Sequence, residues 1–453
     1  MTWFCGNGFS GWRFAAGAAV CVNSAANAKR RRGIENGGCG GGAEVAGGAG
    51  FSFVKKILPL RGVWDTIAAC YMPIKELIAA GVLAGAMFFR MFGVFTALPV
   101  AAVFAARLPG GDAAWIAGIA VGGYGITQAL MQIPSGMLAD YCGRKAALIA
   151  MLLVFAAGGF AAAAAETAWQ LAAGRLLQGG GAVAAITAAW LSDISAPSRR
   201  AKAMLVYGAA IALAFVVSLL LAAPLAGALG LDGIFALSGW LGIVSAAAVL
   251  CLPSPPRPAA VQDSKTALNT EVKICAAGAF VAHYALSALF LRAPLLLEEY
   301  LPLAAHWRVY APAFLLSLAL SLPLVFAEKR VPAPVLAMLL LAAGAAFVFY
   351  NAGLWALGFG MFLFFGGFVV LESLIPARAS RAAPAQKRGK ALGAVMCMEF
   401  LGMFAGAAVS GALLDLSGAG AAFFGILLLI FGWFVIIRSV RPRGGAFLPT
   451  KEG

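Results

Sequence analysis

Charged residues are scarce in this sequence. Asp, Glu, Lys and Arg make up only 11% of the 453 residues, whereas 62% of the residues are hydrophobic. A soluble globular domain averages roughly 25% charged and about 45–50% apolar residues. This composition excludes a disordered chain, a disulfide-stapled secreted domain and an ordinary water-soluble enzyme. We therefore expect a protein that is embedded in a lipid bilayer.

Residues that build active sites and cofactor sites are equally scarce. The chain has only two histidines, His283 and His306, and it has no H-E-x-x-H pair. The cysteines beyond residue 72 show neither metal-ligand spacing nor a disulfide framework. There is no G-x-x-x-x-G-K-[ST] loop, so an ion gradient rather than ATP is the expected energy source. We expect no enzyme, no cofactor and no metal site, with an intramembrane enzyme as a remote alternative.

Long apolar stretches dominate the chain. A helix needs about 20 apolar residues to cross the hydrocarbon core of a membrane. Twelve stretches meet this requirement, and they lie at 78–105, 114–139, 145–165, 167–190, 203–225, 233–252, 274–297, 308–327, 332–350, 353–377, 390–413 and 420–438. The sequence therefore predicts an all-α polytopic membrane protein with twelve transmembrane helices.

The net charge of +15 could indicate nucleic-acid binding, but the basic residues are not arranged for it. With a cytoplasmic N-terminus, only Arg107 and Arg308 fall in loops on the outer side. The inner loops and the end of the chain hold Arg144, Lys145, Arg199, Arg200, Lys202, Arg257, Lys265, Lys273, Lys329, Arg330, Arg378, Arg381, Lys387, Arg388, Lys390, Arg438, Arg441, Arg443 and Lys451. Such a bias orients membrane proteins. We expect a bacterial-type inner (plasma) membrane, both termini in the cytoplasm, and no nucleic-acid partner.

A polar, Pro-rich segment at 253–273 divides the twelve stretches six and six. It predicts a cytoplasmic linker between a six-helix bundle at 72–252 and a second bundle at 274–440, followed by a cytoplasmic tail at 441–453. Many transporters consist of two such halves.

Residues 1–71 do not fit this pattern, because they are Gly-rich and carry the basic run Lys29-Arg30-Arg31-Arg32. We expect a disordered tail. The alternative is that this tail is not translated and that the native protein starts at Met72.

Two motifs carry charge at defined places. After the second stretch comes Gly136-Met-Leu-Ala-Asp140-Tyr-Cys-Gly143-Arg144-Lys145, and the fourth stretch contains Gly174-Arg175-Leu-Leu-Gln178-Gly179. They resemble the "G-x-L-x-D-R-x-G-R-K" loop and the "R-x-x-Q-G" motif of the major facilitator superfamily. The surrounding segments resemble those of its drug:proton antiporter-like branch.

The resemblance implies a cytoplasmic charge cluster of Asp140, Arg144 and Asp193, with Gly143 in the turn, that latches the outward-open state. In the family the acid of this loop also faces the start of span eleven, here near Lys390. Tyr141 stands where an arginine is usual, so one cation of the cluster is missing. The antiporter signature of span five survives only as Ala223-Pro224-Leu-Ala-Gly227, which leaves the direction of transport open.

Charged residues inside the spans are costly, and each is a functional candidate. Arg90, Arg175 and Glu399 lie well inside spans one, four and eleven, and Glu372 lies nearer the inner end of span ten. A buried ion pair is the structural alternative. Because desolvation disfavours the charged form of a carboxyl group, Glu399 is the leading proton-coupling candidate, followed by Glu372. His283 in span seven can also titrate near neutral pH.

Uncharged polar residues mark one face of span two. Tyr124, Gln128 and Gln132 are spaced i, i+4 and i+8, and Gln178 of the second motif is a further candidate. They either bond neighbouring helices or line a substrate cavity.

These features together predict a proton-coupled secondary transporter that works by alternating access, most simply as a monomer. It is expected to export a small, partly apolar compound in exchange for protons. Uptake of a nutrient or metabolite is the alternative.

Overall fold

The computed structural model describes residues 74–196, 199–255, 268–328, 330–384 and 387–439. The expected tail at 1–71, the start at Met72, the segment 441–453 and most of the expected linker at 253–273 lie outside these residues. Within the described residues every regular element is helical. This agrees with the all-α class predicted from the sequence.

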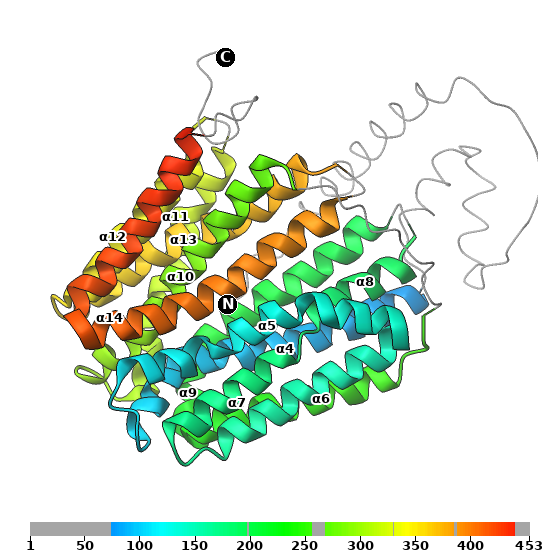
Figure 1. Ribbon diagram of the computed structural model, residues 1–453, viewed down its shortest axis with the longest axis horizontal. Coiled ribbons are helices and arrows are strands. Elements are labelled where there is room, and N and C mark those ends of the chain that lie inside the picture. The colour runs from blue at the N-terminus through cyan, green and yellow to red at the C-terminus, as the bar shows by residue number, and fades with distance from the viewer. Residues whose placement is uncertain (1–73, 197–198, 256–267, 329, 385–386, 440–453) are drawn as a thin grey trace, which may run out of the picture. The chain divides into compact units, whose positions relative to one another are not determined.

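The N-terminal half consists of α4 to α9 and the C-terminal half of α10 to α14 (Figure 1). The helices of the N-terminal half are α4 (Ile74–Arg107), α5 (Ala114–Cys142), α6 (Arg144–Ala163), α7 (Ala168–Gly180), α8 (Ala184–Ile194) and α9 (Arg200–Leu250). Those of the C-terminal half are α10 (Thr270–Glu298), the short η1 (Leu303–Ala305), α11 (Trp307–Phe326), α12 (Ala333–Tyr350), α13 (Leu354–Ala382) and α14 (Arg388–Ser439).

Nine of the helices in the described part of the chain are long and apolar enough to cross a membrane. Two of them are of double length. α9 bends at Gly230 and α14 bends at Gly418, and both glycines have a positive φ, 81° and 79°, which residues with a side chain rarely adopt. Each of these helices therefore supplies two passages joined at one glycine, where the sequence predicts separate helices.

The fourth predicted span differs from expectation. A continuous helix over 167–190 is expected, but α7 ends at Gly180 and α8 begins at Ala184. The three consecutive glycines at 179–181 explain the break, because glycine loses the most backbone entropy in a helix and destabilises it. With α7 and α8 counted as one interrupted passage, the described residues contain the twelve predicted passages.

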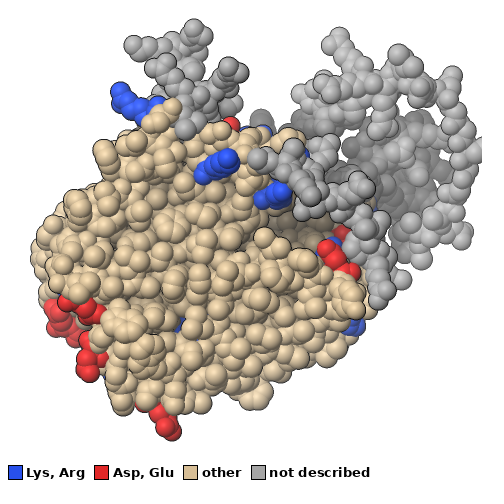
Figure 2. All heavy atoms as spheres, in the orientation of Figure 1, with Lys and Arg blue, Asp and Glu red and all other residues tan. Residues whose placement is uncertain are grey.

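We call the end of the bundle that holds Arg107, Ala114 and Asp415 the outer end, and the opposite end, which holds Asp140 and Arg144, the inner end. These names follow the orientation that the basic residues predict. On the face seen in Figure 2, acidic side chains gather mainly at the outer end and Lys and Arg at the inner end, with a nearly uncharged surface between them.

The two halves meet closely along α5 and α14. A Cβ atom added at Gly122 would lie 2.5 Å from the carbonyl oxygen of Met403, and one added at Gly125 would lie 2.5 Å from that of Phe400. Only glycine permits such a close approach of two backbones, which is how membrane helices associate. The two halves are thus in direct backbone contact over the outer part of α5.

Polar contacts also join the two halves at the outer end. Asp415 of α14 accepts hydrogen bonds from the backbone N–H groups of Ala114 (2.9 Å) and Trp115 (3.0 Å), at the start of α5. Arg107, at the end of α4, forms an ion pair with Glu298, at the end of α10. Both contacts join the N-terminal half to the C-terminal half.

The inner part of α5 is not covered in this way. Ile133, Met137 and Tyr141 are exposed, at 74%, 67% and 87%. A Cβ atom at Gly136 would meet no atom within 4 Å. The described helices are therefore closed against one another at the outer end and open along the inner part of α5.

The Asp415 contact can be tested by substitution. We expect Asp415→Ala to destabilise the conformation with a closed outer end by about 1 kcal/mol, which is typical of a lost helix N-cap. The outward-open population should then rise about 5-fold. Spin labels on cysteines placed at the exposed outer positions Trp169 and Tyr350, with the native cysteines replaced by serine, would report a larger population of long distances. Asp112→Ala removes the same charge from the outer surface and serves as the control. An unchanged distance distribution in Asp415→Ala would contradict the assignment.

The described residues of a small separate unit are 74–77, 195–196 and 199–201. Within it, Arg199 donates hydrogen bonds to both carboxylate oxygens of Glu76, at 3.0 and 2.8 Å. The hydrogen bond to Glu76 raises the pKa of the Arg199 guanidinium above its usual value.

Candidate functional site

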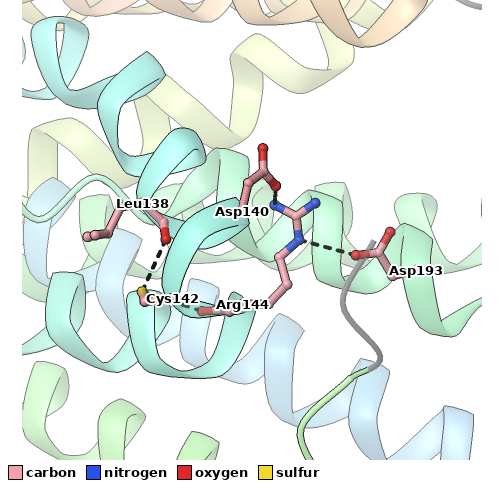
Figure 3. Close-up of polar contacts among 6 residues, drawn as sticks. Leu138, Asp140, Cys142, Arg144 and Asp193 are labelled. Carbon is pink, nitrogen blue, oxygen red and sulfur yellow. Dashed lines mark hydrogen bonds and ion pairs between the residues drawn. The ribbon is translucent and has the colours of Figure 1, made fainter. Parts of the chain in front are cut away.

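The inner end of the N-terminal half holds a charge cluster (Figure 3). Gly143 separates α5 from α6 with a φ of 94°, a conformation that favours glycine. The turn brings Arg144 Nη1 within 2.8 Å of Asp140 Oδ1, and Arg144 Nε donates to Asp193 Oδ2 of α8 at 3.2 Å. The structure thus brings together the three charged residues that the sequence groups. Arg144 is the shared partner, with a side chain only 10% exposed.

The neighbouring Lys145 was not singled out by the sequence. Its Nζ donates to the carbonyl oxygens of Leu250 (2.7 Å) and Leu252 (2.6 Å), where α9 ends. Cations are favourable at the C-terminal ends of helices. Lys145 therefore ties the start of α6 to the end of α9, next to the charge cluster.

A second group of titratable side chains lies in the C-terminal half. His283 of α10, Glu372 of α13 and Glu399 of α14 place their donor atoms within 4.8 Å of one another. His283 Nε2 lies 3.7 Å from Glu372 Oε2, and its Nδ1 lies 3.0 Å from the carbonyl oxygen of Ala279. With the proton on Nδ1, the ring donates to Ala279 and turns Nε2 toward the carboxylates.

The surroundings of this group are largely apolar. The three residues line a small hollow with Ala279, Ala282, Leu371, Ile375 and Pro376. His283 is only 8% exposed, whereas the side chain of Glu372 is 49% exposed. The titratable group therefore reaches from a buried imidazole to a carboxylate that is open to the surroundings.

Imidazole and carboxylate groups are also the donors that divalent transition metals accept. The spacing of these three side chains would let one ion bridge them only after the side chains move together, because zinc ligands lie about 2.0–2.2 Å from the ion. A role of this group in proton coupling stays a prediction.

The buried arginines lie in the other half of the chain. Arg175 of α7 donates to Gln178 Oε1, to the carbonyl oxygen of Ala120 (3.1 Å) and to that of Val121 (3.4 Å). Its guanidinium also lies 4.6 Å from the centre of the Tyr124 ring, a cation–π distance. Within the described residues Arg175 makes no ion pair, so it has polar partners but no charged one.

Arg90 of α4 is also fully buried. It donates to Gln128 Oε1 and approaches Met91 Sδ (3.1 Å) and the carbonyl oxygen of Gly181 (3.5 Å). The ring of Phe155 lies 5.4 Å from its guanidinium carbon. Among the described residues no carboxylate pairs with Arg90, and the buried ion pair that the sequence left open for both arginines is not found.

The uncharged polar candidates are bonded to one another and to neighbouring helices. Gln128 Nε2 donates to Gln132 Oε1 at 3.4 Å, and Tyr124 contacts Met403 Sδ of α14 through its hydroxyl at 2.8 Å. Gln178 Nε2 donates to Ser238 Oγ at 2.8 Å. In this conformation they are buried and bond the helices together, and a role in lining the substrate cavity stays a prediction. Ser238 carries no sequence signal, because serines are frequent in membrane helices.

Comparison with known proteins agrees with this architecture. The family model described as Major Facilitator Superfamily matches residues 82–327. Inner membrane transport protein YajR of Escherichia coli (strain K12) is 32% identical over 367 residues, which cover 78% of this chain and 81% of that protein.

Solved structures share the fold. A bacterial homolog of the human lysosomal transporter Spinster, in an inward-facing and occupied conformation, aligns with a TM-score of 0.63 at 14% identity, covering 81% of this chain and 96% of its own. A D-xylose-proton symporter aligns with a TM-score of 0.62 at 15% identity, covering 82% of this chain and 98% of its own. These findings confirm the major facilitator fold with its two six-helix bundles, and they identify a multi-pass membrane transporter rather than an enzyme. The chain belongs to the Major Facilitator Superfamily.

Proposed function

We propose that this protein is a proton-coupled secondary transporter of the inner (plasma) membrane that exports a small, partly apolar compound and acts as a monomer. The observation that carries the proposal is the meeting of His283, Glu372 and Glu399, from three different helices, inside the membrane-spanning part of the C-terminal half. Ionisable residues at such depth mark proton relays and substrate pathways in membrane proteins. The resemblance of the sequence motifs to drug:proton antiporters supports export.

The depth and exposure of the three side chains support a role in proton exchange. His283 and Glu399 lie near the middle of α10 and of the first segment of α14, and Glu372 lies closer to the inner end of α13. Glu372 is half exposed and lies 3.7 Å from the more buried His283, so it is the member of the group that the surroundings reach first. A proton on Glu399, whose side chain is partly buried, removes a negative charge whose desolvation is costly. Protonation therefore favours the conformation in which this site is most enclosed.

Transport then requires two arrangements of the N-terminal half relative to the C-terminal half. The closure at the outer end and the open inner part of α5 describe one state, with the site facing inward. In the other state the inner ends meet, and the cluster of Asp140, Arg144 and Asp193 would hold them against the start of α14, near Lys390. Protons and substrate shift the balance only by their difference in affinity for the two states. The charge cluster is thus the proposed latch of the outward-open state.

The proposal is tested with the purified full chain in proteoliposomes that contain a trapped pH indicator. A panel of small, partly apolar compounds is added on one side, and proton movement is recorded without any other energy source. Antiport moves protons against the direction of the compound, and symport moves them with it. We expect opposite directions. In a second run with an imposed pH gradient, we expect accumulation of the compound that is lost when an uncoupler is added. Movement in the same direction would support uptake instead, and accumulation that resists the uncoupler would contradict proton coupling.

A further inference from the structure

Arg90 is a buried cation whose hydrogen-bonding capacity is largely unused. A guanidinium carries five N–H donors. Those of Arg90 reach one amide oxygen, Gln128 Oε1, together with a thioether sulfur and a distant carbonyl oxygen at 3.5 Å. Its Nε is buried and has no hydrogen-bond partner in the described part of the chain. A fully buried charge in this state is costly unless another group compensates it.

Arg175 gives the contrast. Every one of its guanidinium nitrogens donates to an oxygen, two of them backbone carbonyls, and its plane is covered by aromatic rings. Each of the three guanidinium nitrogens of Arg175 therefore has an oxygen partner within the fold. Arg90 is equally buried but lacks these partners, so its guanidinium remains available for a ligand.

The break in the fourth passage lies next to Arg90. Arg90 Nη2 is 3.5 Å from the carbonyl oxygen of Gly181, in the segment between α7 and α8. α8 begins at Ala184, so its N-terminal end lies inside the membrane-spanning part rather than at the surface. The first N–H groups of a helix lack partners within it, and its dipole favours negative charge there. Interrupted helices in transporters direct such ends at anionic substrate groups.

We propose that Arg90 and the N-terminal end of α8 bind the acidic group of the transported compound, which is an organic anion such as an aromatic carboxylate. This inference rests on the proposed transport function and specifies its substrate class. The guanidinium fork matches the geometry of a carboxylate. Met91 and Phe155, which contact the guanidinium, provide apolar surface for the body of the ligand.

The route to this site follows α5. Gln128, the partner of Arg90, is bonded to Gln132 one turn further toward the inner end. Gln132 is 7% exposed, and one turn further a Cβ atom at Gly136 would meet no atom within 4 Å, so the buried chain of amides ends where α5 is uncovered. A carboxylate entering from the inner side meets the amide of Gln132 first. It then replaces Gln128 Oε1 as the acceptor for Arg90.

The test uses three probes with one aromatic body and different charge: 1-naphthoate, 1-naphthamide and 1-naphthylmethylammonium. Their binding to the full chain in lipid nanodiscs is measured at equilibrium, without a proton gradient. We expect naphthoate to bind the native protein at least about 10-fold more tightly than naphthamide. Equal affinities, tighter binding of the ammonium, or no binding of naphthoate would overturn the proposal.

Two variants decide whether Arg90 is responsible. Arg90→Gln should abolish the preference for the acid, so that naphthoate binds no more tightly than naphthamide, and Arg90→Lys should retain part of the preference. Without ligand, Arg90→Gln should melt at or above the native temperature, because an uncompensated buried charge is removed. A preserved acid preference in Arg90→Gln, or a much lower melting temperature, would overturn the assignment. Because this assay needs no proton movement, a failure here leaves the proton-flux result unaffected.

Discussion

Replacing Glu399 with glutamine is expected to reduce substrate-driven proton movement to the background of protein-free liposomes. Glutamine keeps the size and the hydrogen-bonding capacity of the side chain but carries no exchangeable acid proton. Glu399 shares its site with His283 and Glu372, which remain in place in the variant. The proton is therefore expected to lose its enclosed binding position while the substrate route stays intact. Exchange of labelled compound across the membrane without a net gradient should continue.

Matched variants sharpen this expectation. Glu372→Gln should lower proton movement less than Glu399→Gln, because the side chain of Glu372 is 49% exposed and water can replace it in proton delivery. Glu166→Gln removes an exposed carboxylate at the outer end and should behave as the native protein. The measurement is the trapped-indicator assay in proteoliposomes. Undiminished proton movement in Glu399→Gln would remove Glu399 from the mechanism.

Gly179→Ala is expected to be strongly destabilising for the N-terminal half. A Cβ atom at this position would lie well inside van der Waals contact with the carbonyl oxygen of Tyr124 and with Thr127 Oγ1, both on α5. Because the first of these atoms belongs to the backbone, α5 and α7 must move apart. Overpacking of this kind costs about 1–3 kcal/mol or more. The separation also stretches the bonds of Arg175 to the carbonyl groups of α5.

The adjacent glycine provides the control. A Cβ atom at Gly180 would have an ordinary contact of 3.5 Å with Val154. Gly180→Ala should therefore be neutral or stabilise the helix by up to about 1 kcal/mol. Melting of the purified proteins in detergent measures both effects. Equal melting temperatures for the two variants would contradict the close approach of α7 to α5.

The sequence contains enough information to predict the transmembrane passages and the orientation in which they cross the membrane. Twenty-residue apolar stretches and one-sided basic loops are local signals, and the pairing of Asp140 with Arg144 is an i, i+4 contact on either side of a glycine turn. The double-length helices were not predicted, because a glycine in a helical pattern does not reveal whether φ becomes positive. The break at 181–183 had a visible cause in the run of glycines. That the break lies beside Arg90 depends on how the helices pack, which the sequence does not reveal.

Contacts between distant segments were beyond the sequence. His283, Glu372 and Glu399 were each identified as candidates, but only the packing of α10, α13 and α14 places them within 4.8 Å. Arg90 and Arg175 look equivalent in the sequence, since both are arginines inside apolar stretches. Backbone carbonyl groups satisfy Arg175 and not Arg90, and backbone groups have no sequence signature. Asp415 was not singled out, although it caps a helix of the other half.

The capping of α5 by Asp415 of α14 has a consequence for biogenesis. α5 begins at Ala114 without a side-chain cap of its own, and its carboxylate partner is encoded about 300 residues later. During synthesis the ribosome releases the N-terminal half first. The first N–H groups of α5 therefore lack their carboxylate acceptor until α14 is inserted. Fraying of this turn is the default state of the newly made half. The ordering of the outer tip of α5 is therefore expected to follow the insertion of α14.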